Sequence, residues 1–305
     1  MDYSVVTALY NGLEHTKAYL ESLQKTMTGE HYEVILVDDG STDGTREFLK
    51  TLHDNPRFKI RLNAENCGFA RSNNLGVGGA EGKFLLLLNN DLVLKPGWLK
   101  PMRAAIEREH PWMGHTRKAS VVGNVQRRLD DGAIDHAGVY FSVYATPAHA
   151  FQNAKKLPKT KFTPWAAATA ACWLLETEYF RALGGFDERY VNGMEDVDFC
   201  LQALENGRVA VVANQSVVEH AISASRGESM EDENNYRKLW EKWRYPLHEW
   251  SVVDQARYTW IKAQTTQAIM SKIKGKALLK LALPFWKTIQ DRSIKFTSNP
   301  STHLR

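Results

Sequence analysis

Residues 81–91 read Glu-Gly-Lys-Phe-Leu-Leu-Leu-Leu-Asn-Asn-Asp, an apolar run that ends abruptly in three polar residues. Such an uninterrupted run is typical of a strand buried on both faces of a parallel sheet. Asn89, Asn90 and Asp91 then fall at the carboxyl end of that strand, where open α/β sheets place their ligands. A carboxylate with amide oxygens beside it can hold a hard divalent cation, although an ordinary Asn/Asp turn has the same composition.

The segments before this strand alternate between strand and helix patterns. Strands are predicted at 4–9, 33–37 and 58–62, each followed by a helix, and these helices end near residues 27, 52 and 78. The alternation predicts an α/β fold with a mostly parallel central sheet and helices on both faces. The pattern blurs over 97–164, where a helix is predicted at about 97–108 and strands at 120–126 and 137–144. Order returns at 166–175 and continues with helices at 177–183 and 196–206, a strand at 208–213 and a polar turn at 214–216.

The length of the chain, 305 residues, suits one α/β domain with an appendage. We place the domain at 1–225 and a helical C-terminal region at 226–305. The three cysteines lie far apart without CxxC or zinc spacing, which is typical of reduced thiols in a cytoplasmic protein. The sequence shows no signal-peptide pattern and no stretch of eighteen apolar residues, so we expect neither secretion nor a transmembrane helix.

Positive charge is concentrated toward the C-terminal end. Residues 251–305 carry ten Lys and Arg against two acids, a net charge of +8, so the total of +4 leaves −4 for residues 1–250. Within 272–292, lysines alternate with leucines and Trp286, which suits an anionic membrane surface, although Pro284 interrupts the helix. A helix packed on the domain or a dimer interface would have the same pattern. Nucleic-acid binding is disfavoured because no recognised module accompanies the charge.

Two more polar segments follow predicted strands. Residues 37–45 place Asp38 and Asp39 at a strand end, where carboxylates could bind a base or ribose. The same segment could instead be a turn in which Ser41, Thr42 or Asp43 caps the next helix. Residues 66–76 begin a helix with small and amide side chains, and its free N–H groups with Arg71 could face a diphosphate. No GxGxxG motif occurs, which weighs against a dinucleotide enzyme.

Acidic residues gather at the start of the predicted helix 196–206. A carboxylate of Glu195 or Asp196 could act there as a general base, or could simply favour the helix electrostatically. His220 follows the next strand, and its imidazole could complete with Asp91 a site for Mn²⁺ or Mg²⁺.

Taken in order, these segments resemble the family 2 glycosyltransferases of the GT-A fold, in particular the rhamnosyltransferase-type enzymes of bacterial surface polysaccharides such as O-antigen. The resemblance covers about residues 3–222 and rests on 7–11, 38–45, 66–76, 88–91, 184–188, 195–198 and His220. It implies an inverting transfer of a sugar, rhamnose among the candidates, from a UDP- or dTDP-sugar. The implied acceptor is a hydroxyl of a glycan or polyprenyl-linked glycan at the inner face of the cell membrane.

The resemblance also implies a role for each matching residue. Asp196, with Glu195 beside it, is expected to be the catalytic base, and Asp91, His220 and Asn89 to be the metal ligands. The other matches are expected to bind the donor: Thr7, Tyr10, Asp38, Asp39, Asn66, Arg71, Asn74, Asn89 and Asn90. Asn89 replaces the first carboxylate of the family's DxD motif, which lowers the ligand charge and the expected metal affinity.

Trp165 and Trp173 are expected to face the acceptor, because aromatic rings suit sugar faces, although core packing would also account for them. Two other functions fit parts of the pattern. A nucleotidyltransferase also needs metal-bound phosphates, but residues 5–16 lack the basic, glycine-rich phosphate loop. A catalytically silent sugar- or membrane-binding scaffold is favoured by Asn89 and opposed by the presence of Asp91, Asp196 and His220.

Overall fold

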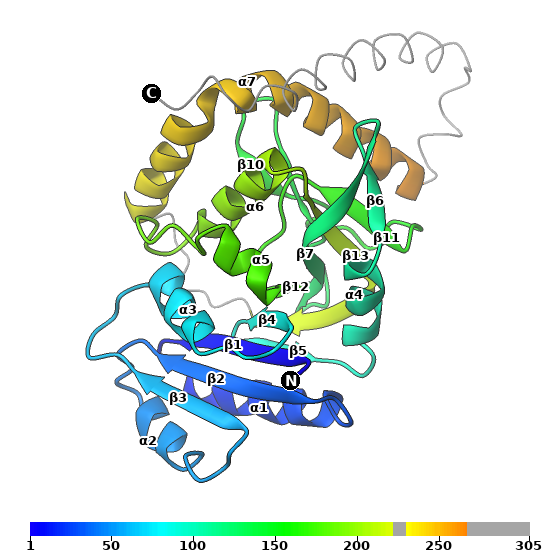
Figure 1. Cartoon of the computed structure of the whole chain (residues 1–305). Coiled ribbons are helices and arrows are strands. Elements are labelled where there is room, and N and C mark those ends of the chain that lie inside the picture. Colours follow the sequence, from blue (N-terminus) through cyan, green and yellow to red (C-terminus); the bar gives the residue numbers. More distant parts are fainter. Residues whose placement is uncertain (222–229, 267–305) are drawn as a thin grey trace, which may run out of the picture.

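The computed structural model describes residues 1–221 and 230–266, and its first part alternates strictly between strands and helices (Figure 1). The elements are β1 (Tyr3–Leu9), α1 (Leu13–Thr26), β2 (Tyr32–Asp38), α2 (Thr45–Lys50), β3 (Phe58–Leu62), α3 (Phe69–Gly78) and β4 (Phe84–Leu88). Each lies within a few residues of its predicted position. Of the residues expected at the start of α2, it is the Asp43 carboxylate, and not Ser41 or Thr42, that accepts the Thr45 N–H.

The four strands are parallel and lie in the order β3-β2-β1-β4. Right-handed crossovers place α1 and α2 on one face of this sheet and α3 on the other, in agreement with the contacts of α3 with β1 and β2. Because both faces are covered, all seven residues of β2 and all five of β4 are buried. The chain reverses its direction of winding between β1 and β4, which makes the carboxyl ends of these two strands the expected ligand site.

The second part extends the sheet with strands of both directions. Its elements are β5 (Leu92–Leu94), α4 (Leu99–Ile106), β6 (Glu109–Trp112), β7 (His115–Arg128), β8 (Ile134–His136), β9 (Val139–Phe141), β10 (Pro147–His149), β11 (Phe162–Trp165), β12 (Cys172–Glu176), α5 (Thr177–Ala182), α6 (Glu195–Glu205), β13 (Val209–His220) and α7 (Met230–Thr266). Beyond β4 the order is β12-β7-β13-β11, in which β12 is antiparallel to β4 and β13 is parallel to β7. The predicted α/β fold with a mostly parallel central sheet is confirmed.

The strand predicted at 208–213 is longer than expected. The polar residues 214–216, which read as a turn, form an irregularity where the register against β7 shifts between Ala213 and Val217. The Asn214 side chain donates to Thr160 and Thr163, so the irregular backbone is supported by hydrogen bonds. The strand then continues and carries His220 at its last position.

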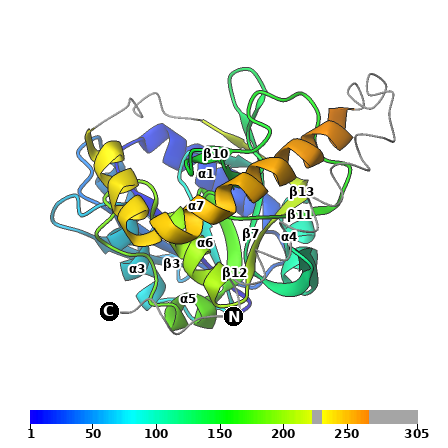
Figure 2. The same ribbon diagram turned by 90° about the horizontal axis from the view of Figure 1, so that it is seen from above.

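The helix α7 belongs to the same hydrophobic core as the sheet. Leu239, Trp243, Leu247 and Trp250 recur on one face of the helix and are all buried. Figure 2 shows α7 crossing over α6. The described part of the predicted C-terminal region is therefore packed on the body of the protein, whereas the basic segment 272–292 lies outside the described residues. Among the residues that the structure describes, no helix is long and apolar enough to cross a membrane.

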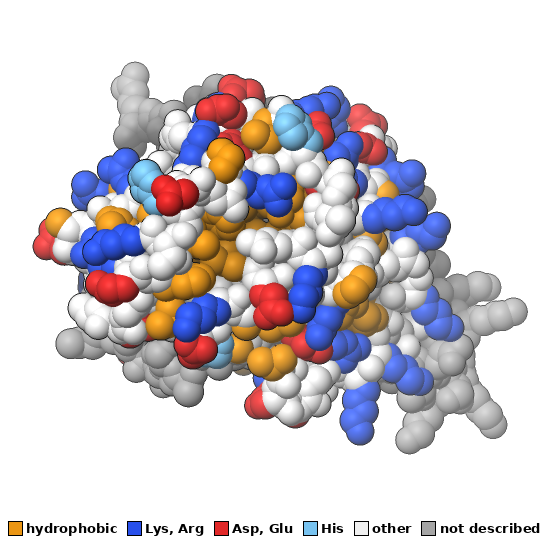
Figure 3. All heavy atoms as spheres, turned by 90° about the horizontal axis from the view of Figure 1, so that it is seen from below, with side chains coloured by type: hydrophobic (Ala, Val, Ile, Leu, Met, Phe, Trp, Pro, Cys, Tyr) orange, Lys and Arg blue, Asp and Glu red, His pale blue; other side chains and the backbone are white. Residues whose placement is uncertain are grey.

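Charge is unevenly spread over the face shown in Figure 3. Acidic and basic side chains are mixed on one flank of this face, whereas Lys and Arg predominate on the other. Positive charge is therefore not confined to the C-terminal segment that the sequence singles out.

Candidate active site

A cavity of about 270 Å³ opens at the carboxyl ends of the central strands. Its lining follows the strand order of the sheet. Tyr10 and Asp39 lie at one end, after β1 and β2, and Asn89 and Asp91 lie in the middle, after β4. The cavity is therefore where the topology of the sheet predicts a ligand site.

The two acids after β2 have different surroundings. Asp39 lines the cavity, and its carboxylate accepts hydrogen bonds of 2.9–3.0 Å from Cys67 N–H, Gly68 N–H and the Asn63 amide. Burial raises the pKa of Asp39, but these hydrogen bonds outweigh it and leave the pKa below its usual value. Asp39 is therefore an ionised acceptor at the cavity wall.

Asp38 is fully buried and does not line the cavity. Its Oδ2 accepts the N–H groups of Gly40 and Ser41 at 3.2 Å and lies 2.9 Å from Arg46 Nε. In this structure Asp38 Oδ2 therefore shapes the turn after β2, and the expected contact of Asp38 with the donor stays a prediction.

The two predicted donor contacts at β1, Thr7 within the strand and Tyr10 just after it, have different surroundings. Tyr10 is 55% exposed and lines the cavity. Thr7 is fully buried with its hydroxyl 2.8 Å from Tyr19 Oη, since it lies inside the strand and points into the core. Thr7 is therefore a core residue, and the expected donor contact at this position is wrong.

The helix α3 contributes its start to the cavity. Asn66 and Phe69 line the cavity, whereas Arg71 is exposed on the helix outside it. Gly68, with φ of 91°, leaves no room for a Cβ, which would lie 2.7 Å from Val191 O. The loop before α6 is thereby held against the start of α3.

Asn74 holds this loop at a second point. Its amide donates to Phe186 O at 2.8 Å and accepts Phe186 N–H at 2.9 Å, and it also donates to Glu188. Because its amide is used by these contacts and Asn74 does not line the cavity, we correct the expected donor contact to a structural one.

The polar triplet after β4 meets the end of β13. Asn89, Asn90 and Asp91 line the cavity, as predicted from the sequence. The Asn90 amide nitrogen already donates hydrogen bonds to Thr16 Oγ1, at 3.0 Å, and to Asn11 O. Asp91 Oδ1 lies 3.1 Å from His220 Nε2, because residue 221 at the end of β13 donates its N–H to Asp91 O.

Asp91 and His220 fit a divalent cation. Both line the cavity, both remain partly exposed, and their facing atoms are as close as two ligands of one ion. No group of three or more His, Cys, Asp or Glu within 1–221 and 230–266 could hold a metal unaided. The remaining ligands would come from phosphate oxygens and water, as is usual for Mg²⁺ sites.

The acids at the start of α6 point in different directions. Asp196 Oδ2 accepts Ala170 N–H at 3.0 Å, and Ala170 lies between the cavity residues Thr169 and Ala171. Glu195 is 5% exposed, and its Oε2 accepts Gly193 N–H at 2.7 Å. Asp196 is thus placed beside the cavity, while Glu195 is turned into its own loop and is not suited to the predicted catalytic role.

The two tryptophans expected at the acceptor are both fully buried. Trp165 is covered by Arg257 and Tyr258 of α7. Trp173 packs against Phe186 and Phe199 beneath α6. The prediction that they contact the acceptor is therefore wrong, because neither ring has a free face.

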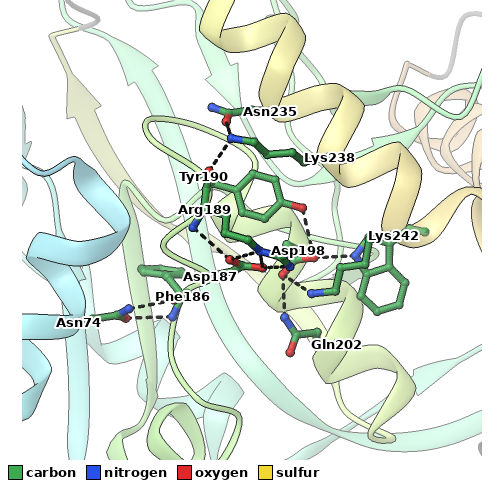
Figure 4. A network of polar contacts seen from close by, with 11 residues as sticks. Asn74, Phe186, Asp187, Arg189, Tyr190, Asp198, Gln202, Asn235, Lys238 and Lys242 are labelled. Atoms are coloured by element: carbon green, nitrogen blue, oxygen red, sulfur yellow. Dashed lines mark hydrogen bonds and ion pairs between the residues drawn. The ribbon is translucent and has the colours of Figure 1, made fainter. Parts of the chain in front are cut away.

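A buried carboxylate two residues after Asp196 joins α6 to α7 (Figure 4). Asp198 accepts the Trp243 indole N–H at 2.6 Å and the Lys242 ammonium at 2.9 Å. Asp198 has no surface in the cavity, so its role is to hold these helices together.

Several cavity residues were not identified from the sequence, and three of them carry polar side chains from the second part of the sheet and its neighbouring hairpin. These are Gln126 on β7, Asp135 on β8 and His149 on β10. Only Gln126 had a sequence signal, because it is a polar residue at the end of the strand predicted at 120–126. Asp135 and His149 lie in the region where the pattern blurs.

Residues 4–184, more than half of the chain, match the family described as Glycosyl transferase family 2. The chain belongs to glycosyl transferase family 2. The family predicted from the sequence motifs is thereby confirmed.

Two curated relatives of this family 2 chain illustrate its similarities. It is 29% identical over 234 residues to the O-antigen biosynthesis protein RfbC of Myxococcus xanthus, a match that covers 73% of this chain but only 17% of RfbC. It is 26% identical over 250 residues to the N-acetylglucosaminyl-diphospho-decaprenol L-rhamnosyltransferase of Mycobacterium tuberculosis, covering 73% of this chain and 77% of that enzyme.

The fold of the family 2 chain is shared with solved structures. The crystal structure of GalNAc-T7 with UDP, GalNAc and Mn²⁺ matches it with a TM-score of 0.66 at 18% identity, covering 85% of this chain and 51% of that one. The match supports the GT-A assignment of the fold.

Proposed function

We propose that this chain is an inverting glycosyltransferase that moves a sugar from a nucleotide diphosphate donor to an acceptor hydroxyl. The observation that carries the proposal is that Asp91 and His220 line one cavity and that Asp196 is hydrogen-bonded to the backbone beside it, in a chain of glycosyl transferase family 2. Such a site combines a place for a phosphate-bound cation with a carboxylate that is close enough to serve an incoming hydroxyl.

The nucleotide lies at the β1–β2 end of the cavity in this proposal. Asp39 accepts hydrogen bonds from the base or ribose, Asn66 contributes its amide, and the exposed ring of Tyr10 covers an apolar face. The diphosphate then reaches Asn89 and Asp91 in the middle of the cavity. Mn²⁺ or Mg²⁺ bound by Asp91 and His220 would act as a Lewis acid on the diphosphate.

Asp196 serves as the general base. Ala170 N–H fixes one carboxylate oxygen at 3.0 Å, so the carboxylate has a set orientation beside the cavity. The acceptor hydroxyl loses its proton to Asp196 as its oxygen attacks the anomeric carbon. The bond from that carbon to the phosphate oxygen breaks on the opposite side, which inverts the configuration.

We infer a UDP- or dTDP-sugar, rhamnose included, as the donor and a glycan or polyprenyl-linked glycan as the acceptor, in the synthesis of a cell-surface polysaccharide. The names of RfbC and of the mycobacterial rhamnosyltransferase support the acceptor class, and the UDP bound by GalNAc-T7 supports the donor class.

We also propose that the protein works in the cytoplasm, at the inner face of the membrane, through the basic segment 272–292. Co-sedimentation with anionic phospholipid vesicles tests this, with binding expected at low salt and lost at high salt. Equal sedimentation with and without vesicles would contradict it.

Calorimetric titration of UDP and of dTDP, each with and without Mn²⁺, tests the proposed function. Binding of one nucleotide that strengthens with Mn²⁺ is expected, and it would also identify the base of the donor. Nucleotide binding with the same affinity in the presence and absence of Mn²⁺ would be consistent with a glycosyltransferase, but it would contradict the proposal that Asp91 and His220 bind a metal ion. No binding under any condition would contradict the proposal and favour a silent scaffold.

A further inference from the structure

Gln126 of β7, Asp135 of β8 and His149 of β10 also line the cavity, and we call these three residues the distal wall, because β7 and β8 lie several strands from β2 and Asp39 in the sheet. We propose that the distal wall binds the hydroxyl groups of the sugar carried by the donor. This inference rests on the proposed function and extends it, since none of the motifs that identify the family includes these residues.

Gln126 is the observation that points to a ligand. Only 1% of its surface is exposed, it lines the cavity, and neither its Oε1 nor its Nε2 has a hydrogen-bond partner among the described residues. Buried amides are normally paired, because an unpaired polar group loses its hydration without compensation. An amide left unpaired at a cavity wall is explained when a ligand supplies the missing partners.

The position of Gln126 identifies which part of the donor it meets. On β7 it is opposite Val218 of β13, two residues before His220, and opposite His136 of β8. The sugar is covalently joined to the diphosphate, so it must lie directly beside the group held at Asp91 and His220. Gln126 is paired with the strand that carries His220, so the distal wall lies next to that point.

The chemistry of the distal wall suits neutral hydroxyls. His149 Nδ1 lies 3.2 Å from Asp135 O and 3.7 Å from its Oδ2, which leaves Nε2 to meet a ligand. The Asp135 carboxylate would repel a phosphate but can accept a hydrogen bond from a hydroxyl group. Each sugar hydroxyl can both donate and accept a hydrogen bond, and so can the Gln126 amide.

A buried neutral histidine fixes this wall. His136 Nε2 accepts the N–H groups of Gly138 and Thr169, which requires the uncharged ring. The His149 ring packs edge-on against it with centroids 4.9 Å apart. The distal wall is therefore in place before a ligand arrives.

The first test is the thermal unfolding of the protein without ligand. Replacing an unpaired buried amide by an apolar side chain of similar shape should stabilise the folded protein. Gln126→Met is therefore expected to raise the Tm by about 2 °C or more. Asn214→Leu is the control, since Asn214 is buried and its amide nitrogen donates to Thr160 and Thr163, so losing these hydrogen bonds should lower the Tm. A fall in the Tm of Gln126→Met would show that the amide has a structural partner and would overturn the inference.

The second test is calorimetry with UDP and dTDP against UDP-glucose, UDP-N-acetylglucosamine and dTDP-rhamnose, without acceptor. Gln126→Met and Asp135→Asn are expected to bind the nucleotide diphosphate as the wild type does, and to weaken binding of the nucleotide-sugar about tenfold, the loss of one good hydrogen bond. Unchanged affinity for every nucleotide-sugar would overturn the inference and leave the distal wall to the acceptor. If the wild type binds no nucleotide, the proposed function itself fails, and the two failures are thereby distinguished.

Discussion

The ammonium nitrogen of Lys242 on α7 lies 2.9 Å from a carboxylate oxygen of Asp198 on α6, and that carboxylate is fully buried. The same carboxylate also accepts the Trp243 indole N–H and the Gln202 amide (Figure 4). Asp198 is two residues from Asp196, so the contact that anchors α7 also fixes the first turn of the helix that presents the proposed base. The C-terminal helix therefore contributes to the geometry of the site without contacting the cavity.

Asp198→Ala is expected to destabilise the fold. It leaves the Lys242 ammonium and the Trp243 indole without their shared acceptor, and removing one partner of a buried pair costs about 3–5 kcal/mol. The free energy of unfolding in urea measures this. Glu241→Gln, an exposed position on the same helix, is the control and should unfold like the wild type. Equal midpoints for Asp198→Ala and the control would refute the anchoring role.

Asp196→Asn is expected to lower turnover about 10²–10⁴-fold, the usual contribution of a general base. The amide keeps an oxygen to accept Ala170 N–H, so nucleotide affinity should stay within about twofold of the wild type. Release of nucleotide diphosphate from the donor measures turnover, and Asp130→Asn on the surface serves as the control. A variant with normal turnover would exclude Asp196 as the base.

Asp91→Asn and His220→Gln are expected to remove most of the effect of Mn²⁺ on nucleotide binding. Each takes away one of the two proposed metal ligands, so affinity in the presence of Mn²⁺ should fall at least about tenfold while affinity without it changes little. Paired titrations with and without Mn²⁺ give this ratio, and His53→Gln, an exposed position, is the control. If both variants respond to Mn²⁺ as the wild type does, the cation is held elsewhere.

The strands of the central sheet could be predicted because a strand that is buried on both faces has an uninterrupted run of apolar residues. The apolar run from Phe84 to Leu88 has no polar interruption, and the polar residues after it must then lie at the ligand edge of the sheet. Asp39, Asn89 and Asp91 were placed at the cavity for this reason.

Contacts that depend on distant segments could not be predicted in this way. Trp165 is an aromatic residue in an irregular region, and only the packing of α7, more than ninety residues later, decides that its ring is covered. Thr7 and Asp38 have neighbours at the cavity, but the direction of each side chain depends on partners such as Tyr19 and Arg46 that no local pattern reveals.

A buried acid in the contact between α7 and β9 should make stability depend on pH. Asp254 is fully buried and its Oδ2 accepts Phe141 N–H at 2.7 Å. Burial raises the pKa of Asp254 to about 7, although the nearby Arg257 guanidinium and this hydrogen bond act in the opposite direction. In the unfolded chain the pKa of an aspartic acid is about 3.9.

The sign follows from which state keeps the proton. Above about pH 4 Asp254 has lost its proton in the unfolded chain, whereas it keeps the proton in the folded protein up to about pH 7. The contribution of Asp254 to the free energy of unfolding is therefore largest below pH 4 and is lost as the pH rises to about 7. Asp254→Asn resembles the protonated form at every pH. Its free energy of unfolding, relative to the wild type, should therefore increase between pH 5 and 8 by on the order of 2 kcal/mol. Urea unfolding across this range measures the difference, with Asp130→Asn as the exposed control. A difference that does not change with pH would mean that Asp254 stays ionised beside Arg257 in the folded protein.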